Sequence, residues 1–168
     1  GNCILRIPEN YQGSPIITGW FAEFDVPEQA PDKVNFGTGQ SAFAGSTYDP
    51  VSHYRAAEVF DFFDEHNLSD TKLREVSQQQ IGLLWKGIES MGLSYECLAF
   101  PSHDIIDNAG FLSLTTAKAS EWVTELGQKG ILCDSRGHQL RFGPAPYVSK
   151  FQLEQSLNVI EDLARRIF

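Results

Sequence analysis

The sequence predicts an α+β fold in which a small antiparallel or mixed sheet carries helices on one face. Several stretches repeat apolar residues at three- or four-residue steps and are bounded by helix start and stop signals. The second half also holds short β-prone runs, two of which flank a loop of hairpin length. Its order of strand, strand, helix, hairpin and helix is typical of the α+β class.

Length and composition narrow the possible functions. The 168 residues predict one compact domain, or a small domain with an extra arm, and 42% hydrophobic residues are enough for a core. The net charge of -9, without a basic stripe, argues against a nucleic-acid partner. Since no apolar run is long enough to cross a bilayer and no signal-peptide pattern opens the chain, we expect a cytoplasmic protein without membrane contact.

The first 48 residues predict an arm and loop region, and residues 49–168 predict the small folded domain. Residues 4–7 and 15–18 are β-prone runs next to prolines, which favours strand ends or arms. From Pro27 to Gly45 the chain is polar and rich in helix and strand breakers, which predicts a long loop over the surface or onto a partner. Because Gly1 stands where a start methionine is expected, we expect a cleaved piece of a longer protein.

Two helices in tandem follow this loop. Asp49 is an N-cap before a proline, and the helix that it opens is expected to end near His66. Ser69 caps the second helix, which is expected to end at Gly92. The apolar residues of the first helix predict one buried stripe, made of Val51, Tyr54, Ala57, Phe60 and Phe63.

The remaining chain alternates short strands with helices. Residues 95–100 and 110–115 predict strands, and Thr116 is a candidate cap for a helix that ends at Gly130. Residues 131–134 and 139–142 then predict a β-hairpin.

The last helix begins after a proline-rich break. Ser149 and Gln152 have the spacing of a capping box, which predicts its start. Its apolar residues predict a buried stripe of Phe151, Leu157, Ile160 and Leu163.

Common catalytic and metal-binding patterns are absent from the sequence. Residues 102–104 carry the letters of a hydrolytic triad, but neighbouring side chains point to different sides and cannot form its relay. The histidines lack metal-ligand spacing, so no metal site is predicted. Cys3, Cys97 and Cys133 form no C-x-x-C pair, which predicts reduced thiols.

Two residues remain as candidates for binding. Arg141 ends a predicted strand just before the break at Gly143, where its guanidinium would suit a carboxylate ligand or pair with one of the many acids at the surface. The indole N–H of Trp20 would suit a ligand phosphate, unless Trp20 simply packs in the core.

Several segments, taken in order, resemble the C-terminal part of kynureninase and its class V aminotransferase relatives. They are residues 1–8 (GNCILRIP), 15–21 (PIITGWF), 43–50 (FAGSTYDP), 130–134 (GILCD) and 140–146 (LRFGPAP). The resemblance implies a pyridoxal-phosphate (PLP) enzyme of the aspartate aminotransferase fold, fold-type I. It implies that this chain is the small C-terminal domain with a linker helix and an arm from the edge of the large domain.

The resemblance also implies roles for individual residues. Trp20 matches a tryptophan that contacts the cofactor phosphate, and Arg141 matches the arginine that holds the substrate α-carboxylate. Ser46 and Thr47 fall at the phosphate-binding position of class V relatives, where kynureninases have an asparagine near the substrate. Thr47 therefore moves the expectation from kynurenine towards other amino-acid substrates of the class.

The resemblance places the Schiff-base lysine upstream of residue 1, so no residue of this chain is expected to be catalytic and the chain alone is expected to be inactive. It implies a homodimeric parent enzyme in which the arm helps to build the neighbouring subunit's site. Whether that parent is an aminotransferase or a kynureninase-like hydrolase stays open. Two other functions also stay open: a stand-alone amino-acid-binding module, and a structural half that assembles with a separate large domain.

Overall fold

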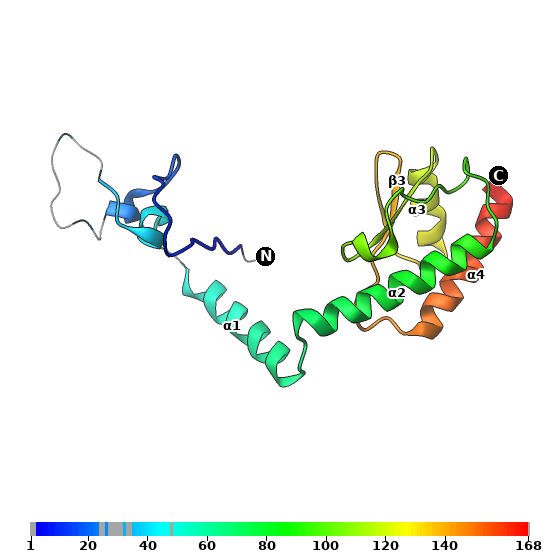
Figure 1. Ribbon diagram of the computed structural model, residues 1–168, viewed down its shortest axis with the longest axis horizontal. Coiled ribbons are helices and arrows are strands. Elements are labelled where there is room, and N and C mark those ends of the chain that lie inside the picture. Colours follow the sequence, from blue (N-terminus) through cyan, green and yellow to red (C-terminus); the bar gives the residue numbers. More distant parts are fainter. Residues whose placement is uncertain (1–2, 24–25, 27–31, 33–34, 48, 168) are drawn as a thin grey trace. The chain divides into compact units, whose positions relative to one another are not determined.

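The computed structural model describes residues 3–23, 26, 32, 35–47 and 49–167. The chain divides into two compact units, Gly1–Asn67 and Leu68–Phe168 (Figure 1). Since the division falls after Asn67, the first long helix belongs to the first unit. The boundary after residue 48 marks a change in composition and stays a prediction.

The second unit is an α+β domain whose sheet has three antiparallel strands in the order β1-β3-β2. Its elements, in chain order, are α2 (Asp70–Ser90), the 3-10 turn η3 (Ile105–Asp107), β1 (Leu112–Thr115), α3 (Ala119–Gln128), β2 (Asp134–Arg136), β3 (Gln139–Phe142) and α4 (Lys150–Ile167). The predicted hairpin is confirmed as β2 and β3, with Gly137 in the left-handed region (φ 56°) at its turn. The predicted fold class is therefore confirmed.

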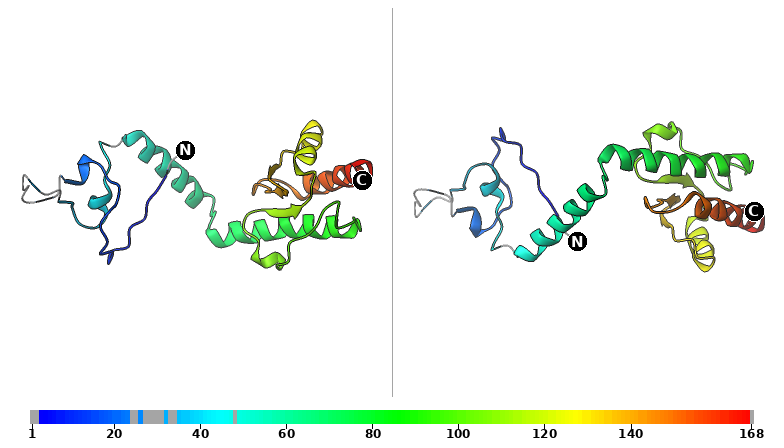
Figure 2. Two further views of the ribbon diagram at one scale, coloured as in Figure 1. Left: turned by 90° about the horizontal axis from the view of Figure 1, so that it is seen from above. Right: turned by 90° about the horizontal axis from the view of Figure 1, so that it is seen from below.

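One face of this sheet is buried under the helices. The core joins α2, α3 and α4 to the inward side chains of β1 and β3. Its largest fully buried members are Ile81, Leu84, Ile88, Leu112, Leu114, Trp122, Leu126, Leu140, Ile160 and Leu163. Helices α2 and α4 lie side by side (Figure 2). The side chain of Leu157 on α4 fills the space over Gly87 on α2.

The helix starts follow the predicted caps. Asp49 accepts a hydrogen bond from the Val51 amide, and Ser69 accepts one from the Lys72 amide. The capping box at the start of α4 also forms, because the Ser149 amide donates to the Gln152 side chain over 2.9 Å. Local hydrogen bonds thus explain these boundaries.

Two expectations, one about a strand and one about a cap, need correction. Residues 95–100 are not a strand, since only Ala99 forms a bridge, to Thr115. The Cys97 amide instead donates to the Ser94 carbonyl and hydroxyl oxygens, which folds this segment into a turn. Thr116 does not cap α3, whose N-cap is Lys118. The Thr116 hydroxyl instead accepts a hydrogen bond from the amide of Lys118, the residue just before the helix.

The buried stripe predicted for α4 also differs from the observed burial. Phe151 is 68% exposed, because it lies about two and a half turns before Ile160 and so on the opposite side of α4. Leu153 takes its place in the core.

The first unit contains the 3-10 turns η1 (Trp20–Glu23) and η2 (Gly39–Phe43) and the helix α1 (Pro50–Glu65). No residue of α1 is buried, so the predicted buried stripe on it is wrong. Tyr54 is 74% exposed and Phe60 54%. Periodicity shows that one side of a helix is apolar, but burial needs a surface that packs against that side.

Candidate functional site

Arg141 lies on the face of the sheet opposite the helices. Along β3, Leu140 and Phe142 point into the core, so Arg141 between them points the other way. Its direct cross-strand neighbours are Ser113 on β1 and Asp134 on β2. These three side chains therefore form one polar row across the sheet.

Arg141 and Asp134 form a two-point ion pair across the hairpin. Nε of Arg141 donates to Oδ1 of Asp134 over 2.6 Å, and Nη2 donates to Oδ2. The Arg141 side chain is 26% exposed and that of Asp134 is 55% exposed. A pair with a nearby acid, one of the two interpretations left open for Arg141, is thus present in the structure.

An open cavity of about 430 Å³ adjoins this ion pair. The guanidinium carbon of Arg141 lies 5.2 Å from the centre of the Phe111 ring, within the range of a cation–π contact. The cavity is lined by Gly110, Phe111, Leu132, Cys133, Asp134, Arg141 and Gly143. The cavity therefore combines the Arg141–Asp134 ion pair with mostly apolar walls. The N–H donors of the Arg141 guanidinium suit a ligand carboxylate that is carried by an apolar body.

The protonation states of the side chains that line this cavity follow from their contacts. The hydrogen bond from Arg141 lowers the pKa of Asp134, and the same bond raises the pKa of Arg141. Burial, and to a lesser extent the charge of Asp134, raises the pKa of the Cys133 thiol to about 11. At neutral pH the cavity thus holds an ion pair and an uncharged thiol.

The chain after Arg141 is held by Gln80 of α2. Gln80 is buried, and its Nε2 donates to the carbonyl oxygens of Ala145, over 3.0 Å, and Val148, over 2.9 Å. These bonds tie the segment that follows β3 to the longest helix of the unit. No sequence pattern pointed to Gln80, because its partners lie 65 and 68 residues further along the chain.

The first unit pairs the backbone of residues 18–21 with that of residues 42–45. The Gly19 amide donates to the Ala44 carbonyl over 3.2 Å, and the Phe21 amide donates to the Gly45 carbonyl over 3.4 Å. A Cβ on Gly19 would lie 1.6 Å from the Gly45 carbonyl oxygen, so only glycine fits there.

The Thr18 hydroxyl strengthens this pairing, since it donates to the carbonyl oxygens of Ala42 and Ala44 over 2.9 and 3.1 Å. Trp20 lies within one of the paired segments, and Ser46 and Thr47 directly follow the other.

Each of these three residues is exposed. Trp20 is 58% exposed, and its ring meets that of Phe21 edge-on at 5.3 Å between centroids. Core packing of Trp20, the other interpretation of this residue, is therefore wrong for this structure. The donors at this place are an indole N–H and the hydroxyls of Ser46 and Thr47.

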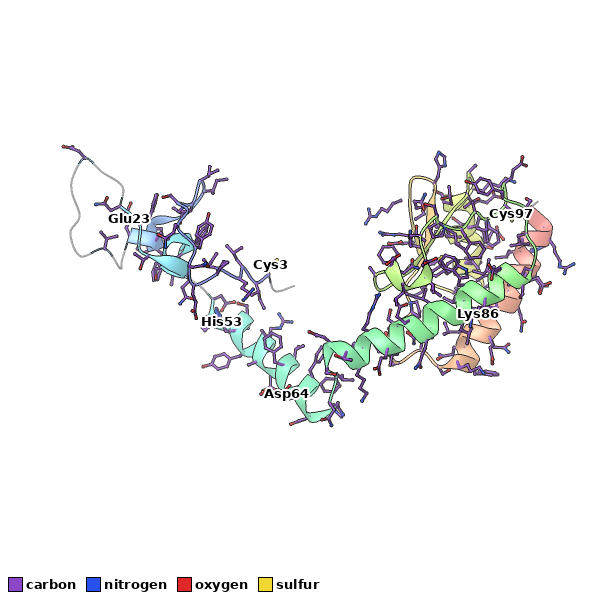
Figure 3. All side chains as sticks on the ribbon, viewed as in Figure 1. Cys3, Glu23, His53, Asp64, Lys86 and Cys97 are labelled. Atoms are coloured by element: carbon purple, nitrogen blue, oxygen red, sulfur yellow. The ribbon has the colours of Figure 1, made fainter. Side chains whose placement is uncertain are left out.

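The lysines within the described ranges lie at the surface of their elements. Lys86 projects from α2 and is exposed (Figure 3). Lys72, Lys129 and Lys150 are exposed too, and Lys118 is half-buried at the N-cap of α3. Lys33 lies outside the described residues. None of the described lysines sits in a buried pocket.

The described part of the chain has neither a membrane-spanning helix nor a cluster of metal-ligating side chains. Its helices are all too short or too polar to span a membrane. No three side chains of His, Cys, Asp or Glu gather there as a metal site would require.

Known protein families and curated protein sequences give no match to this chain. Solved structures do. The apo structure of cysteine desulfurase from Thermococcus onnurineus NA1 matches with a TM-score of 0.71 and 16% identity, over 90% of this chain and 40% of that chain. A structure described as a NifS-like protein matches with a TM-score of 0.56 and 14% identity, over 94% of this chain and 40% of that chain.

These matches define the class of fold. The chain has the fold of part of the cysteine desulfurase and NifS-like structures. It spans about 40% of the length of the structures that it matches. At 16% and 14% identity the likeness concerns the fold, and it does not single out kynureninase.

Proposed function

We propose that this chain is the C-terminal portion of a PLP-dependent enzyme of the class V group that acts on an amino acid. The observation that carries the proposal is the pairing of residues 18–21 with residues 42–45, because it brings the segment of Trp20 against the segment that continues into Ser46 and Thr47. The shared fold supports the class, and the cavity beside Arg141 supports a carboxylate-bearing substrate.

The gathered donors fit a phosphate group. Phosphate oxygens accept hydrogen bonds, and an indole N–H with two hydroxyls supplies donors without a competing negative charge. Trp20, Ser46 and Thr47 would hold the phosphate of PLP in this proposal. PLP, when bound, acts as an electron sink for the α-carbon of the amino acid.

Arg141 would bind and orient the substrate. Its guanidinium offers parallel N–H donors to a carboxylate, and its contact with Phe111 keeps the planar group from turning freely. A bound α-carboxylate would be fixed in direction, which aligns the rest of the amino acid. No residue of this chain is assigned a proton-transfer step, so we propose that it is inactive alone and that the cofactor-binding lysine lies outside it.

The particular reaction is also a matter of proposal. Thr47 stands where the resemblance places an asparagine near the substrate of kynureninases, which argues against kynurenine as the substrate and leaves both an aminotransferase and a kynureninase-like hydrolase as candidates. We further propose that the whole protein is a cytoplasmic homodimer in which the arm around Trp20 and Thr47 helps to build the partner's site.

A titration with pyridoxine 5′-phosphate tests the phosphate site. This compound lacks the aldehyde of PLP and so cannot react with the surface lysines. We expect shifts of the Trp20 indole N–H and of the Ser46 and Thr47 amides in NMR spectra of the 15N-labelled chain. Pyridoxine, which lacks the phosphate, is the matched control and is expected to leave these signals in place.

Two results would count against the proposal. Equal shifts with both compounds would remove the phosphate from the interaction, and shifts confined to the second unit would place the site elsewhere. Calorimetry of the chain with free amino acids distinguishes a further function, because only an amino-acid-binding module would bind them tightly without cofactor.

A further inference from the structure

The ion pair with Asp134 uses only one edge of the Arg141 guanidinium. A guanidinium has five N–H donors, one on Nε and two on each terminal nitrogen. Asp134 takes the Nε donor and one Nη2 donor. Within the described residues, Nη1 has no hydrogen-bond partner, so the terminal edge of Nη1 and Nη2 keeps two parallel donors.

The hairpin holds Asp134 in place for this contact. Asp134 and Arg141 are direct cross-strand partners in the β2–β3 register, and a tight turn at Gly137 joins the two strands. Phe111 packs against the guanidinium, 5.2 Å from its carbon. The Asp134 carboxylate and the Phe111 ring thus set the plane and direction of the Arg141 guanidinium.

We propose that Asp134 is a positioning residue. It binds the Nε side of the Arg141 guanidinium and so presents the terminal donors on Nη1 and Nη2 to a ligand carboxylate in the adjoining cavity. The inference rests on the proposed role of Arg141 in carboxylate binding. In this arrangement Asp134 stays bound to Arg141 when the ligand binds. The apolar walls of the cavity, Phe111 and Leu132, favour ligands whose carboxylate is carried by an apolar body.

Removing Asp134 shows whether it positions Arg141 or competes with the ligand for it, because the two roles change carboxylate binding in opposite directions. If Asp134 only competes with the ligand for Arg141, its removal takes away a negative charge and tightens carboxylate binding. If Asp134 positions the Arg141 guanidinium, removing Asp134 lets this group turn. Carboxylate binding then weakens, although the cavity has lost a negative charge. These two outcomes are opposite in direction.

The test uses 3-phenylpropanoate as the probe and its uncharged amide, 3-phenylpropanamide, as the matched control ligand. NMR titrations follow the side-chain Nε–H and Nη–H signals of Arg141 in the 15N-labelled chain. For the unaltered chain we expect binding of the acid only, with the Nη signals shifting and the Nε–H signal staying in place, because its bond to Asp134 persists.

Variants then measure the contribution of Asp134. We expect Asp134→Ala to weaken binding of the acid about tenfold, the scale of a lost charge-assisted contact, and Asp134→Asn to weaken it less. Glu161→Ala is the control variant, since it removes an acid of the same charge and breaks the Arg165–Glu161 pair on the surface of α4. It is expected to bind the probe like the unaltered chain.

Two failures can be told apart. Equal or tighter binding by both Asp134 variants would overturn the positioning role and leave the carboxylate role of Arg141 intact. If the unaltered chain does not bind the acid, or binds acid and amide alike, the carboxylate role is wrong, and the inference about Asp134 is wrong with it.

Discussion

Gly19 and Gly45 approach so closely that a Cβ on Gly19 would lie 1.6 Å from the Gly45 carbonyl oxygen. Glycine at position 19 is therefore a requirement of this backbone pairing. The same pairing brings the segment that holds Trp20 against the segment that continues into Ser46 and Thr47, so the spacing of the proposed phosphate donors depends on a contact between two backbones.

Gly19→Ala is expected to open this pairing. The two hydrogen bonds that the Gly19 and Phe21 amides donate across the pairing contribute about 1 kcal/mol each. Local stability is therefore expected to fall by about 2 kcal/mol. Hydrogen exchange of the Phe21 amide measures this loss. Gly45→Ala is the control, because a Cβ there meets no atom within 4 Å. Unchanged exchange in Gly19→Ala would contradict the close approach.

Gly87→Ala is expected to destabilise the second unit by about 1 kcal/mol. Its Cβ would lie 2.4 Å from a Leu157 methyl carbon on α4, and this overpacking outweighs the gain in helix propensity of about 1 kcal/mol. Urea unfolding measures the free energy. Gly82→Ala, also within α2, would meet only an Ile105 methyl carbon at 3.6 Å and is expected to stabilise by about 0.5–1 kcal/mol. The same sign for both substitutions would refute the packing of α2 on α4.

The ion pair of Asp134 and Arg141 predicts a pH dependence of stability. Because Arg141 lowers the pKa of Asp134 from 3.8, the folded state favours the ionised carboxylate. The pair's contribution is therefore fully present above the unfolded pKa and is lost as the pH falls through the lower, folded pKa. Unfolding of the unaltered chain and of Asp134→Asn between pH 2 and 6 is expected to differ most at about pH 5–6. A difference that grows towards pH 2 would show that the pKa shift has the opposite sign.

The cysteines are expected to react at different rates. Cys3 is exposed, whereas burial raises the pKa of Cys97 and raises that of Cys133 to about 11. At pH 8 about one Cys133 in a thousand is then a thiolate, the form that reacts. Iodoacetamide labelling followed by peptide mass mapping is expected to modify Cys3 first. Labelling of Cys133 as fast as Cys3 would mean that its thiol is not desolvated.

The helix boundaries were predictable because their signals are local. Asp49, Ser69 and Ser149 each cap a helix through a bond to a residue two or three positions away. The strand predicted at residues 95–100 failed for a related reason. Ser94 offers its backbone and side-chain oxygens to the Cys97 amide, and this local bond replaces strand pairing.

The candidate site was predictable only in part. The place of Arg141 at the end of a strand could be inferred from its sequence neighbours. Its partner Asp134 could not, because the pair depends on the register of the hairpin, and a shift of one residue would move Asp134 to the other face. Gln80 gave no signal at all, since its bonds join two distant segments.

The amino-acid sequence by itself determined the fold class, the starts of α1, α2 and α4, and the residue types that offer donors to an anion. Those properties depend on apolar periodicity, on caps and on side-chain chemistry, which act over a few residues. Only the tertiary structure decided that residues 18–21 pair with residues 42–45, and that Asp134 binds one edge of the Arg141 guanidinium. Backbone approach and strand register bring together residues far apart in the chain, and neither leaves a local pattern.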